Sequence, residues 1–197
     1  MLHWPPSRAE QLYQQSDATL RAQLYGRMET TEATVLIFTE QPGRALERLD
    51  QALAQDPIVQ RRSRKHYWRA LALYKLHRSE AAREVLESLL AEHDPPPILM
   101  TCCRAHGLAA DIALDDQRLD AADYHLGEAT RAAHLLQDRY QIARLDRAWA
   151  RLAAHRGDTV VAQARLESAL DIFTRLGMAY DIARVNDDRE RLGLDTP

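Results

Sequence analysis

The sequence predicts an all-α fold made of stacked helical hairpins, and three observations support this prediction. First, two alanine positions twelve residues apart recur in four copies: Ala33 and Ala45, Ala70 and Ala82, Ala110 and Ala122, Ala150 and Ala162. Second, mostly apolar residues follow the first alanine by three and four residues and the second by four, seven and eight, which is the spacing of one helix face. Third, polar or helix-breaking residues separate the two helices of each copy over segments short enough only for antiparallel neighbours.

The elements follow in order from the amino end of the chain. Pro5 and Pro6 precede Ser7, which is a suitable helix cap, and the helix that runs to about Gln15 is expected to cover the first full copy as a half-repeat. The four copies then occupy residues 18–56, 57–94, 95–137 and 138–177. Prolines open two of the first helices, at Pro57 and at Pro95 to Pro97, where proline is tolerated.

A closing helix is expected over residues 179–192, after Gly177 ends the last copy. Its start repeats the previous unit, because Tyr180, Ile182 and Ala183 stand 40 residues after Tyr140, Ile142 and Ala143. The helix then becomes polar from Asp187 to Arg191, as a capping helix must where stacking stops. Because the alanine register runs through all copies, the chain is predicted to be one domain over residues 1–197.

These residues resemble the tetratricopeptide repeat (TPR) family. The family pattern has a small residue in the first helix, a large one three later, an alanine twelve later, then a large residue, a small residue and a proline. That pattern is met in order by Ala33, Leu36, Ala45, Leu49, Ala52 and Pro57. The longer period is similar to the 40-residue variety of scaffold proteins and of sensor arms in bacterial regulators. The resemblance covers residues 18 to 192 and implies a right-handed superhelical solenoid.

The chain departs from the family pattern at two places. A large aromatic residue early in the first helix is replaced by Glu29, His66, His106 and Asp146 in the four copies. The last two copies also lack the proline.

Composition excludes several classes of protein. The chain has 197 residues, a net charge of −3 and a pI near 6.2, so it has no overall attraction to nucleic acid or to a membrane surface. No apolar run approaches the length of a membrane span, and the segment from Met1 to Pro6 lacks the features of a signal peptide. Its two cysteines, Cys102 and Cys103, are adjacent, which argues against a structural disulfide. We therefore expect a cytoplasmic protein.

A basic stripe is predicted along the first helices. An arginine stands six residues before each first-helix alanine. On a helical wheel, the positions three residues before, one after and five after the same alanine lie on the side of that arginine. The resemblance implies that this stripe lines a concave groove in which extended peptides or helices bind. The candidate groove residues are Arg27, Arg64, Tyr67, Leu71, Lys75, Arg104, Asp111, Arg144, Arg147, Arg151, His155 and Arg184. The strongest positive field is expected around Arg144, Arg147, Arg151 and Arg184.

The favoured hypothesis is a protein-interaction module that binds an acidic peptide or partner segment in this groove. Guanidinium groups bind carboxylates through two parallel hydrogen bonds, and Tyr67 and Leu71 could hold an apolar anchor. The competing interpretation is a solvated stripe that is paired internally, with Asp111 and Asp115 neutralising Arg147 and Arg151.

Other functions were weighed against this hypothesis. The alternative function is the signal-sensing arm of a bacterial transcription regulator that binds a peptide or a small metabolite. Nucleic-acid binding through the arginines is disfavoured by the scarcity of lysine and by an acidic outer face, and self-association is left open.

The sequence shows no catalytic or metal-binding motif. Cys102, Cys103 and His106 lie within one helical turn but lack a fourth ligand at suitable spacing, so the cysteines are predicted to be buried small residues. Adjacent carboxylates at Asp115 and Asp116, and at Asp187 and Asp188, fall in a predicted turn and on the cap, where we expect them to be solvated. We therefore predict a protein without enzymatic activity, cofactor or metal.

Overall fold

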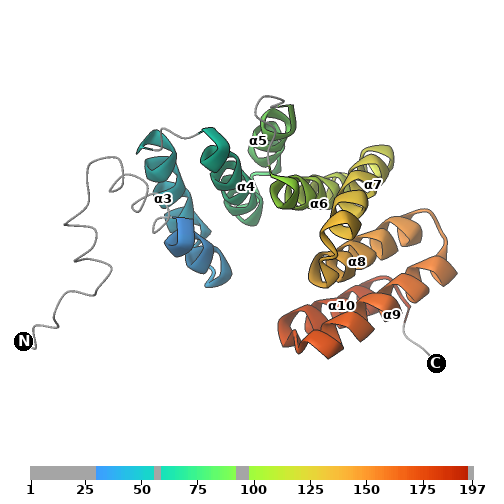
Figure 1. Cartoon of the computed structure of the whole chain (residues 1–197). Coiled ribbons are helices and arrows are strands. Elements are labelled where there is room, and N and C mark those ends of the chain that lie inside the picture. Colours follow the sequence, from blue (N-terminus) through green and yellow to red (C-terminus); the bar gives the residue numbers. More distant parts are fainter. Residues whose placement is uncertain (1–29, 56–58, 92–97, 195–197) are drawn as a thin grey trace, which may run out of the picture. The chain divides into compact units, whose positions relative to one another are not determined.

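The structure is a computed structural model that describes residues 30–55, 59–91 and 98–194. The described residues form α-helices and short turns, without a β-strand among them (Figure 1). Residues 30–38 are helical, and the helices that follow are α3 (Pro42–Gln55), α4 (Val59–Lys75), α5 (Ser79–Ala91), α6 (Leu99–Asp115), α7 (Leu119–Leu136), α8 (Arg139–His155), α9 (Thr159–Leu176) and α10 (Ala179–Arg191). The all-α prediction is confirmed. The predicted amino-terminal half-repeat and the opening prolines lie outside the described residues.

The chain divides into two compact units, Met1–Val85 and Leu86–Pro197, with the division inside α5. In the amino-terminal unit α3 packs against α4. Its buried residues include Ala33, Leu49 and Leu73, and Trp68 of α4 meets the ring of Phe38 edge to face at 6.3 Å. The unit therefore contains one helical hairpin followed by the first helix of the next copy.

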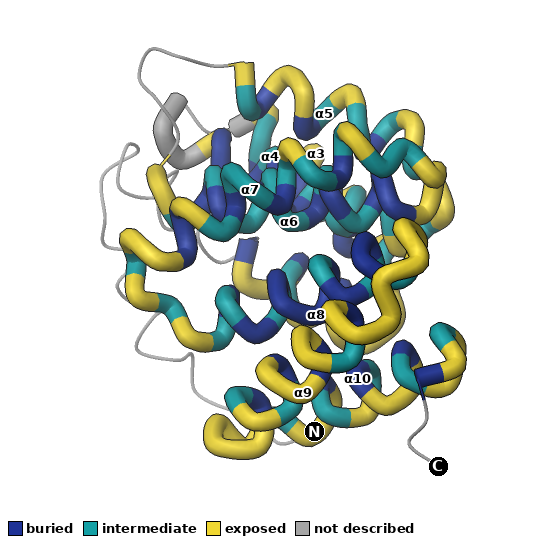
Figure 2. The backbone as a smooth tube through the Cα atoms, turned by 90° about the vertical axis from the view of Figure 1, so that its right-hand side faces the viewer, coloured by how far each residue is buried: buried dark blue, intermediate teal, exposed yellow. Residues whose placement is uncertain are grey.

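The carboxy-terminal unit contains two hairpins and a last helix. Helix α6 packs against α7, α8 packs against α9, and α8 also contacts both helices of the preceding hairpin, while α10 packs against α9. One apolar cluster joins α6, α7 and α8 around Leu114, Leu126 and Leu152, and a second joins α8, α9 and α10 around Phe173 and Val185. Because it has neighbours on both sides, α8 is largely buried, whereas α9 shows many exposed positions (Figure 2).

The eight repeated alanines are the most regular feature of the core. Each of them has 0% of its surface exposed. A methyl group is small enough to let two helix backbones approach closely, and there is no space at these positions for a larger side chain. The predicted inward direction of both alanine positions is therefore confirmed in all four copies.

Helix starts repeat with the same period as the alanines. The first helices α4, α6, α8 and α10 begin at residues 59, 99, 139 and 179, and the second helices α5, α7 and α9 begin at residues 79, 119 and 159. The predicted third and fourth copies each contain one hairpin, and the predicted cap coincides with α10 to within one residue.

The turn inside each hairpin also repeats, in its backbone conformation. Seven residues after each first-helix alanine one residue adopts a left-handed conformation, namely Glu40, His77, Gln117 and Gly157, with φ of 58°, 57°, 57° and 81°. The amide of the next residue then donates to the carbonyl oxygen five residues earlier, as from Arg118 to Ala113 and from Asp158 to Ala153. This is the Schellman arrangement that ends a helix. The four copies thus share one backbone turn, although four different residue types occupy its left-handed position.

The turn between the two carboxy-terminal hairpins and the turn before α10 are of the same kind. Gln137 and Gly177 end α7 and α9 in the left-handed conformation. Asp138 caps the next helix by accepting a hydrogen bond from the amide of Gln141, and Asp158 caps α9 in the same way. The amino ends of α8 and α9 therefore have a backbone amide satisfied by a local side chain, whereas α6, α7 and α10 lack such a side-chain cap.

We predict that exchanging the turn residues of two copies changes stability in opposite directions. A left-handed conformation costs a residue with a Cβ atom about 1 kcal/mol more than glycine. Gln117→Gly should therefore raise the free energy of unfolding and Gly157→Gln should lower it, each by about 1 kcal/mol or less. Space is not a factor at Gly157, since a Cβ atom there would meet nothing within 4 Å.

Urea unfolding followed by circular dichroism measures both effects. Gln163→Gly, within α9, is the matched control and should destabilise the protein, because glycine is unfavourable inside a helix. A shift in the same direction for Gln117→Gly and Gly157→Gln would contradict the explanation.

Candidate functional site

The candidate groove residues fall into both units of the chain. Arg27 lies outside the described residues. Four of the others are on α4 in the amino-terminal unit, and seven are on α6, α8 and α10 in the carboxy-terminal unit. The structure therefore brings together the carboxy-terminal set, and each set is described by itself.

The α4 residues do not all lie on an exposed stripe. Arg64 and Lys75 are exposed and Leu71 is half-buried, but Tyr67 has only 3% of its surface exposed. The Tyr67 ring packs edge to face against Trp68 with 5.0 Å between ring centroids. The surface position expected for Tyr67 is thus not observed, because its ring belongs to the core of this unit.

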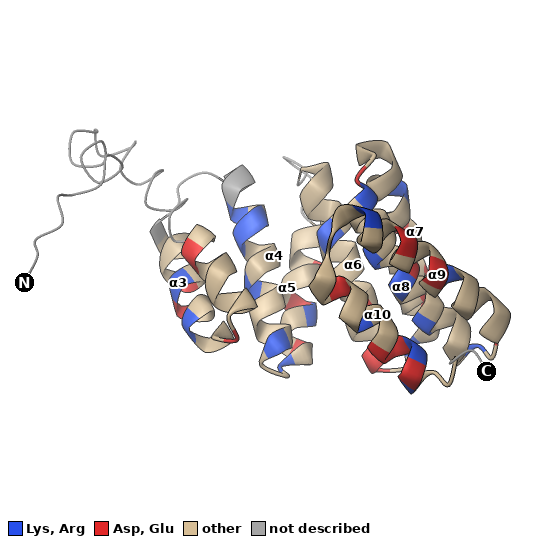
Figure 3. Cartoon of the chain, turned by 90° about the horizontal axis from the view of Figure 1, so that it is seen from below, with Lys and Arg blue, Asp and Glu red and all other residues tan. Residues whose placement is uncertain are grey.

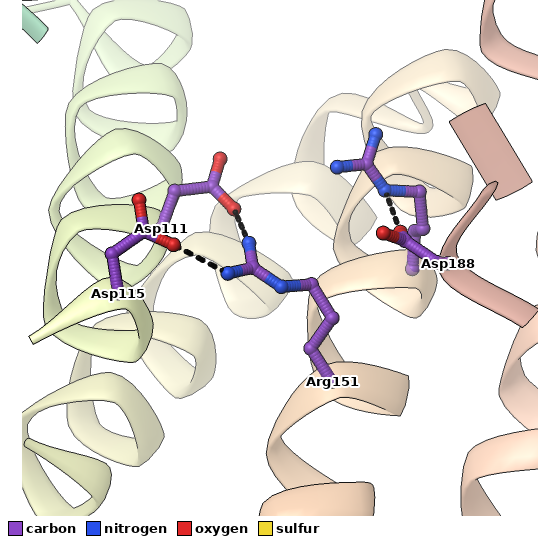
Figure 4. Close-up of polar contacts among 5 residues, drawn as sticks. Asp111, Asp115, Arg151 and Asp188 are labelled. Carbon is purple, nitrogen blue, oxygen red and sulfur yellow. Dashed lines mark hydrogen bonds and ion pairs between the residues drawn. The ribbon is translucent and has the colours of Figure 1, made fainter. Parts of the chain in front are cut away.

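Arg151 of α8 forms the centre of an ion-pair cluster with α6. Its Nη1 lies 3.1 Å from Oδ1 of Asp111 and its Nη2 lies 2.6 Å from Oδ1 of Asp115 (Figure 4). Arg151 and Asp111 are 40 residues apart, so they occupy equivalent positions of neighbouring copies. The first helices of the two hairpins are therefore stacked in register. This pairing is the one that the internally paired interpretation anticipated for Arg151.

Arg147 of α8 pairs with α10 instead of α6. Its Nε lies 2.6 Å from Oδ2 of Asp188, and the two side chains are 10% and 11% exposed (Figure 4). The N–H bond does not point at that oxygen, so the contact is an ion pair without an aligned hydrogen bond. Arg147 was expected to be exposed, but it is buried, and its carboxylate partner is Asp188 instead of Asp111 or Asp115.

The electrostatic surroundings of Arg147 combine burial with charges of both signs. Burial lowers the pKa of its guanidinium, and the nearby charge of Arg184 lowers it further. Asp188 and Asp111 act in the opposite direction, with smaller effects than that of Arg184. Arg147 therefore lies among both cations and carboxylates, and its burial is the largest cause of the lowered pKa.

The repeat-equivalent arginines Arg104, Arg144 and Arg184 are each half-buried on α6, α8 and α10. Both Arg104 and Arg144 influence Cys103, which shows that the two guanidinium groups approach the same part of the unit. Arg184 in turn influences Arg147, one turn along α8 from Arg144. Basic and acidic positions occur together on α8 and α10, where blue and red mark them in Figure 3. His155, at the end of α8, is exposed.

Polar pairs occupy equivalent positions inside the two carboxy-terminal hairpins. In the α6–α7 hairpin, Nδ1 of His106 lies 3.0 Å from Nδ1 of His125. In the α8–α9 hairpin, Asp146 accepts hydrogen bonds from Arg165 at 2.6 Å and from Ser168 at 2.8 Å. His106 and Asp146 are equivalent positions, and so are His125 and Arg165, so each hairpin uses a polar pair at the same place.

The cysteines have the environment of inert core residues. Cys103 is 1% exposed, and burial is the largest cause that raises the pKa of its thiol to about 11. Burial also raises the pKa of the Cys102 thiol. Within the described ranges, no group of three histidine, cysteine or carboxylate side chains is arranged to hold a metal ion. The predicted burial of Cys103 is confirmed, whereas Cys102 is only half-buried.

Two important carboxylates were not recognised in the sequence. Asp188 was expected to be solvated on the cap, but it is buried, 8% exposed, because it lies three residues after Val185 on the inner face of α10. In the sequence Asp146 stands out only because it replaces an aromatic residue of the repeat pattern, and nothing there indicates that it accepts hydrogen bonds. The spacing of Asp188 from Val185 is the signal that could have placed it on the inner face.

Comparison of the chain with models of known protein families and with curated proteins finds no match. The described helices include none that is long and apolar enough to cross a membrane.

We predict that Arg151→Gln destabilises the carboxy-terminal unit by about 1–2 kcal/mol, because it leaves Asp111 and Asp115 without their shared cation in a partly buried place. Urea unfolding at low and high salt measures the change. Adding Asp111→Asn to Arg151→Gln should recover part of the loss. If Arg151→Gln has no effect even at low salt, the cluster does not hold α6 and α8 together.

We also predict that acid destabilises the α6–α7 hairpin through its histidine pair. Burial is the largest cause that lowers the pKa of His125 to about 4, with a smaller contribution from His106, and burial also lowers the pKa of His106. Between about pH 6.5 and pH 4 the unfolded chain therefore binds more protons than the folded chain, so stability falls as the pH falls.

Histidine NMR titration and urea unfolding across this pH range test the prediction. His125→Phe should flatten the pH dependence, whereas the control His155→Gln, at an exposed position, should leave it unchanged. A His125 signal that titrates near the ordinary histidine pKa would contradict it.

Proposed function

We propose that the chain is a protein-interaction module with no reaction of its own, and that it binds an acidic peptide or partner segment along the first helices of its carboxy-terminal unit. We further propose that its hairpins continue as a right-handed TPR-like superhelix. The resemblance noted in the sequence and the 40-residue repeat of helix starts support this architecture.

One observation carries the proposed binding function. Residues 40 apart on α6 and α8 are in direct contact, as Asp111 and Arg151 demonstrate. Arg104, Arg144 and Arg184 stand at equivalent sequence positions of three first helices and are each half-buried, which supports the proposal that they form a row. Half-buried arginines keep part of their guanidinium accessible while they are held by their neighbours. Such a row is suited to an extended segment that presents carboxylates at regular intervals.

The internal ion pairs limit which arginines can take part. Arg151 is already engaged by two carboxylates, so its charge is largely consumed inside the unit. We therefore assign the partner contacts to the repeat-equivalent arginines, which are not members of the Arg151 cluster. Because these side chains are in contact with solvent, binding should weaken as ionic strength rises.

We predict that Arg104→Glu combined with Arg144→Glu lowers the affinity for a fluorescently labelled, glutamate-rich peptide. Each reversal replaces an attraction by a repulsion, so we expect at least a tenfold loss, about 1.4 kcal/mol. Fluorescence anisotropy measures the affinity. Arg151 is left unchanged in this design, because its reversal would bring three carboxylates together and destabilise the fold.

The matched control reverses two arginines of the second helices, Arg131→Glu and Arg175→Glu, whose side chains are 68% and 71% exposed. It has the same net charge as the test variant, so a difference between the two reports position and not total charge. Equal affinity for both double variants would overturn the proposed binding face.

A further inference from the structure

Two histidines meet inside the α6–α7 hairpin. His106 comes from α6 and His125 from α7, and their Nδ1 atoms lie 3.0 Å apart. Each histidine is half-buried, and the exposed ring of Tyr124 packs edge to face against both of them. The pair is therefore held by the two helices of one hairpin and is still accessible to solvent.

The hydrogen bond between these rings leaves much of their bonding capacity unused. In an N–H···N contact one Nδ1 donates and the other accepts. Among the residues that the structure describes, neither ring makes a further hydrogen bond. The equivalent place of the α8–α9 hairpin differs, because both carboxylate oxygens of Asp146 accept a hydrogen bond there. Of the two polar pairs, the histidines are thus the one that is less completely satisfied by groups of the chain.

The distances between the rings match those of two imidazoles bound to one metal ion. A zinc ion binds nitrogen at about 2.0–2.1 Å with tetrahedral angles. Two imidazoles on such an ion hold their ligating nitrogens about 3.3 Å apart and their ring centroids about 5.2 Å apart. The ring centroids of His106 and His125 are 5.2 Å apart. A small rotation of the rings, which lengthens the distance between the Nδ1 atoms from 3.0 Å to about 3.3 Å, is enough to direct both lone pairs at one ion.

The electrostatic state of the pair also suits a metal ion. Imidazole binds metals in its neutral form, and burial is the largest cause that lowers the pKa of both histidines. The cations that act on the pair, Arg131 on His106 and Arg118 on His125, are each ion-paired with a carboxylate. Glu87 acts on His125 in the opposite direction. Both rings are therefore neutral near pH 7 and can bind through a lone pair.

The chemistry of the pair selects the class of ion. Sγ of Cys103, three residues before His106, donates to the carbonyl oxygen of Ala129 at 3.5 Å. Within the described ranges, the two histidines are not part of a group of three metal-binding side chains. Two imidazoles favour borderline ions such as Zn²⁺ and Cu²⁺ over Mg²⁺ and Ca²⁺, which prefer oxygen ligands. Water is then the remaining source of ligands.

We propose that His106 and His125 bind one borderline divalent transition-metal ion, represented by Zn²⁺, through their Nδ1 atoms, and that water completes its coordination. The proton of the donating Nδ1 moves to Nε2 of the same ring, so no proton leaves the protein. The ion joins α6 to α7 and stabilises the folded hairpin, because the unfolded chain does not hold the two rings together. This site is independent of the proposed binding function and replaces the expectation of a protein without metal. Nineteen residues separate the two histidines, so spacing within one helix could not indicate it.

Titration of the full chain with Zn²⁺ at pH 7 tests the site, with histidine ¹H–¹⁵N NMR spectra as the readout. Zn²⁺ should shift the Nδ1 signals of His106 and His125 in a saturable way and leave both rings protonated at Nε2. Mg²⁺ should cause no such shift. Nδ1 signals of the native protein that do not respond to Zn²⁺ would overturn the proposal.

Variants test which side chains bind the ion. His125→Gln should weaken zinc binding at least tenfold in isothermal titration calorimetry, because one imidazole remains. The matched control His134→Gln removes an exposed histidine from the same helix and should leave the affinity unchanged. Cys102→Ser should also leave it unchanged. A tenfold loss in either control would show a different set of ligands and so contradict the proposal.

Thermal unfolding provides a second measurement. Zn²⁺ should raise the Tm of the native protein and of His134→Gln, because it binds the folded hairpin more tightly than the unfolded chain. His106→Gln should show no such rise, with circular dichroism to confirm that it folds. A rise that persists in His106→Gln would mean that the ion binds elsewhere, and the assigned site would be wrong.

Discussion

The close approach of helices at the repeated alanines is the constraint on which the rest of this structure depends. In every copy both helices of the hairpin carry an alanine with no exposed surface, and so small a side chain permits a close approach of the helices. Hairpins of equal thickness can stack at a regular spacing, and in the carboxy-terminal unit equivalent helices begin 40 residues apart. Equivalent residues of adjacent copies then meet, as Asp111 and Arg151 do. The regular packing of the repeated alanines is thus consistent with the contact between repeat-equivalent residues on the first helices.

The α6–α7 and α8–α9 hairpins each contain a polar pair in their interior. At equivalent places of the two hairpins, α6 and α7 bring together two histidines, and α8 and α9 bring together Asp146 with Arg165 and Ser168. Asp146 is 7% exposed and has its acceptors satisfied, which offsets the cost of its burial. The two hairpins therefore share a backbone but differ in chemistry, and burial lowers the pKa of both histidines, so that the folded pair resists protonation on mild acidification.

Helical periodicity in the sequence correctly predicted which positions face the core and where the closing helix lies. It did not predict features that depend on contacts between helices. The alanines, the apolar steps after them and the place of α10 all follow from helical spacing. The left-handed turn residues could not be predicted in this way. Three of the four are Glu40, His77 and Gln117, residue types that do not favour this conformation, and the hairpin imposes it on them. A helical wheel placed Arg147 on the exposed side, yet α10 and its Asp188 cover that side. Burial of that kind is a property of two helices and cannot be read from one.

The ion pairs of the first-helix face have a structural role that is compatible with the proposed binding. Arg151 lies within ion-pair distance of two carboxylates on α6, and Arg147 lies within ion-pair distance of Asp188 on α10. These contacts join α8 to the first helix before it and to the closing helix after it. Removing one member of a partly buried ion pair leaves the other without compensation, which costs free energy. A charge reversal at Arg147 or Arg151 would therefore change the stability of the unit before it reported on binding.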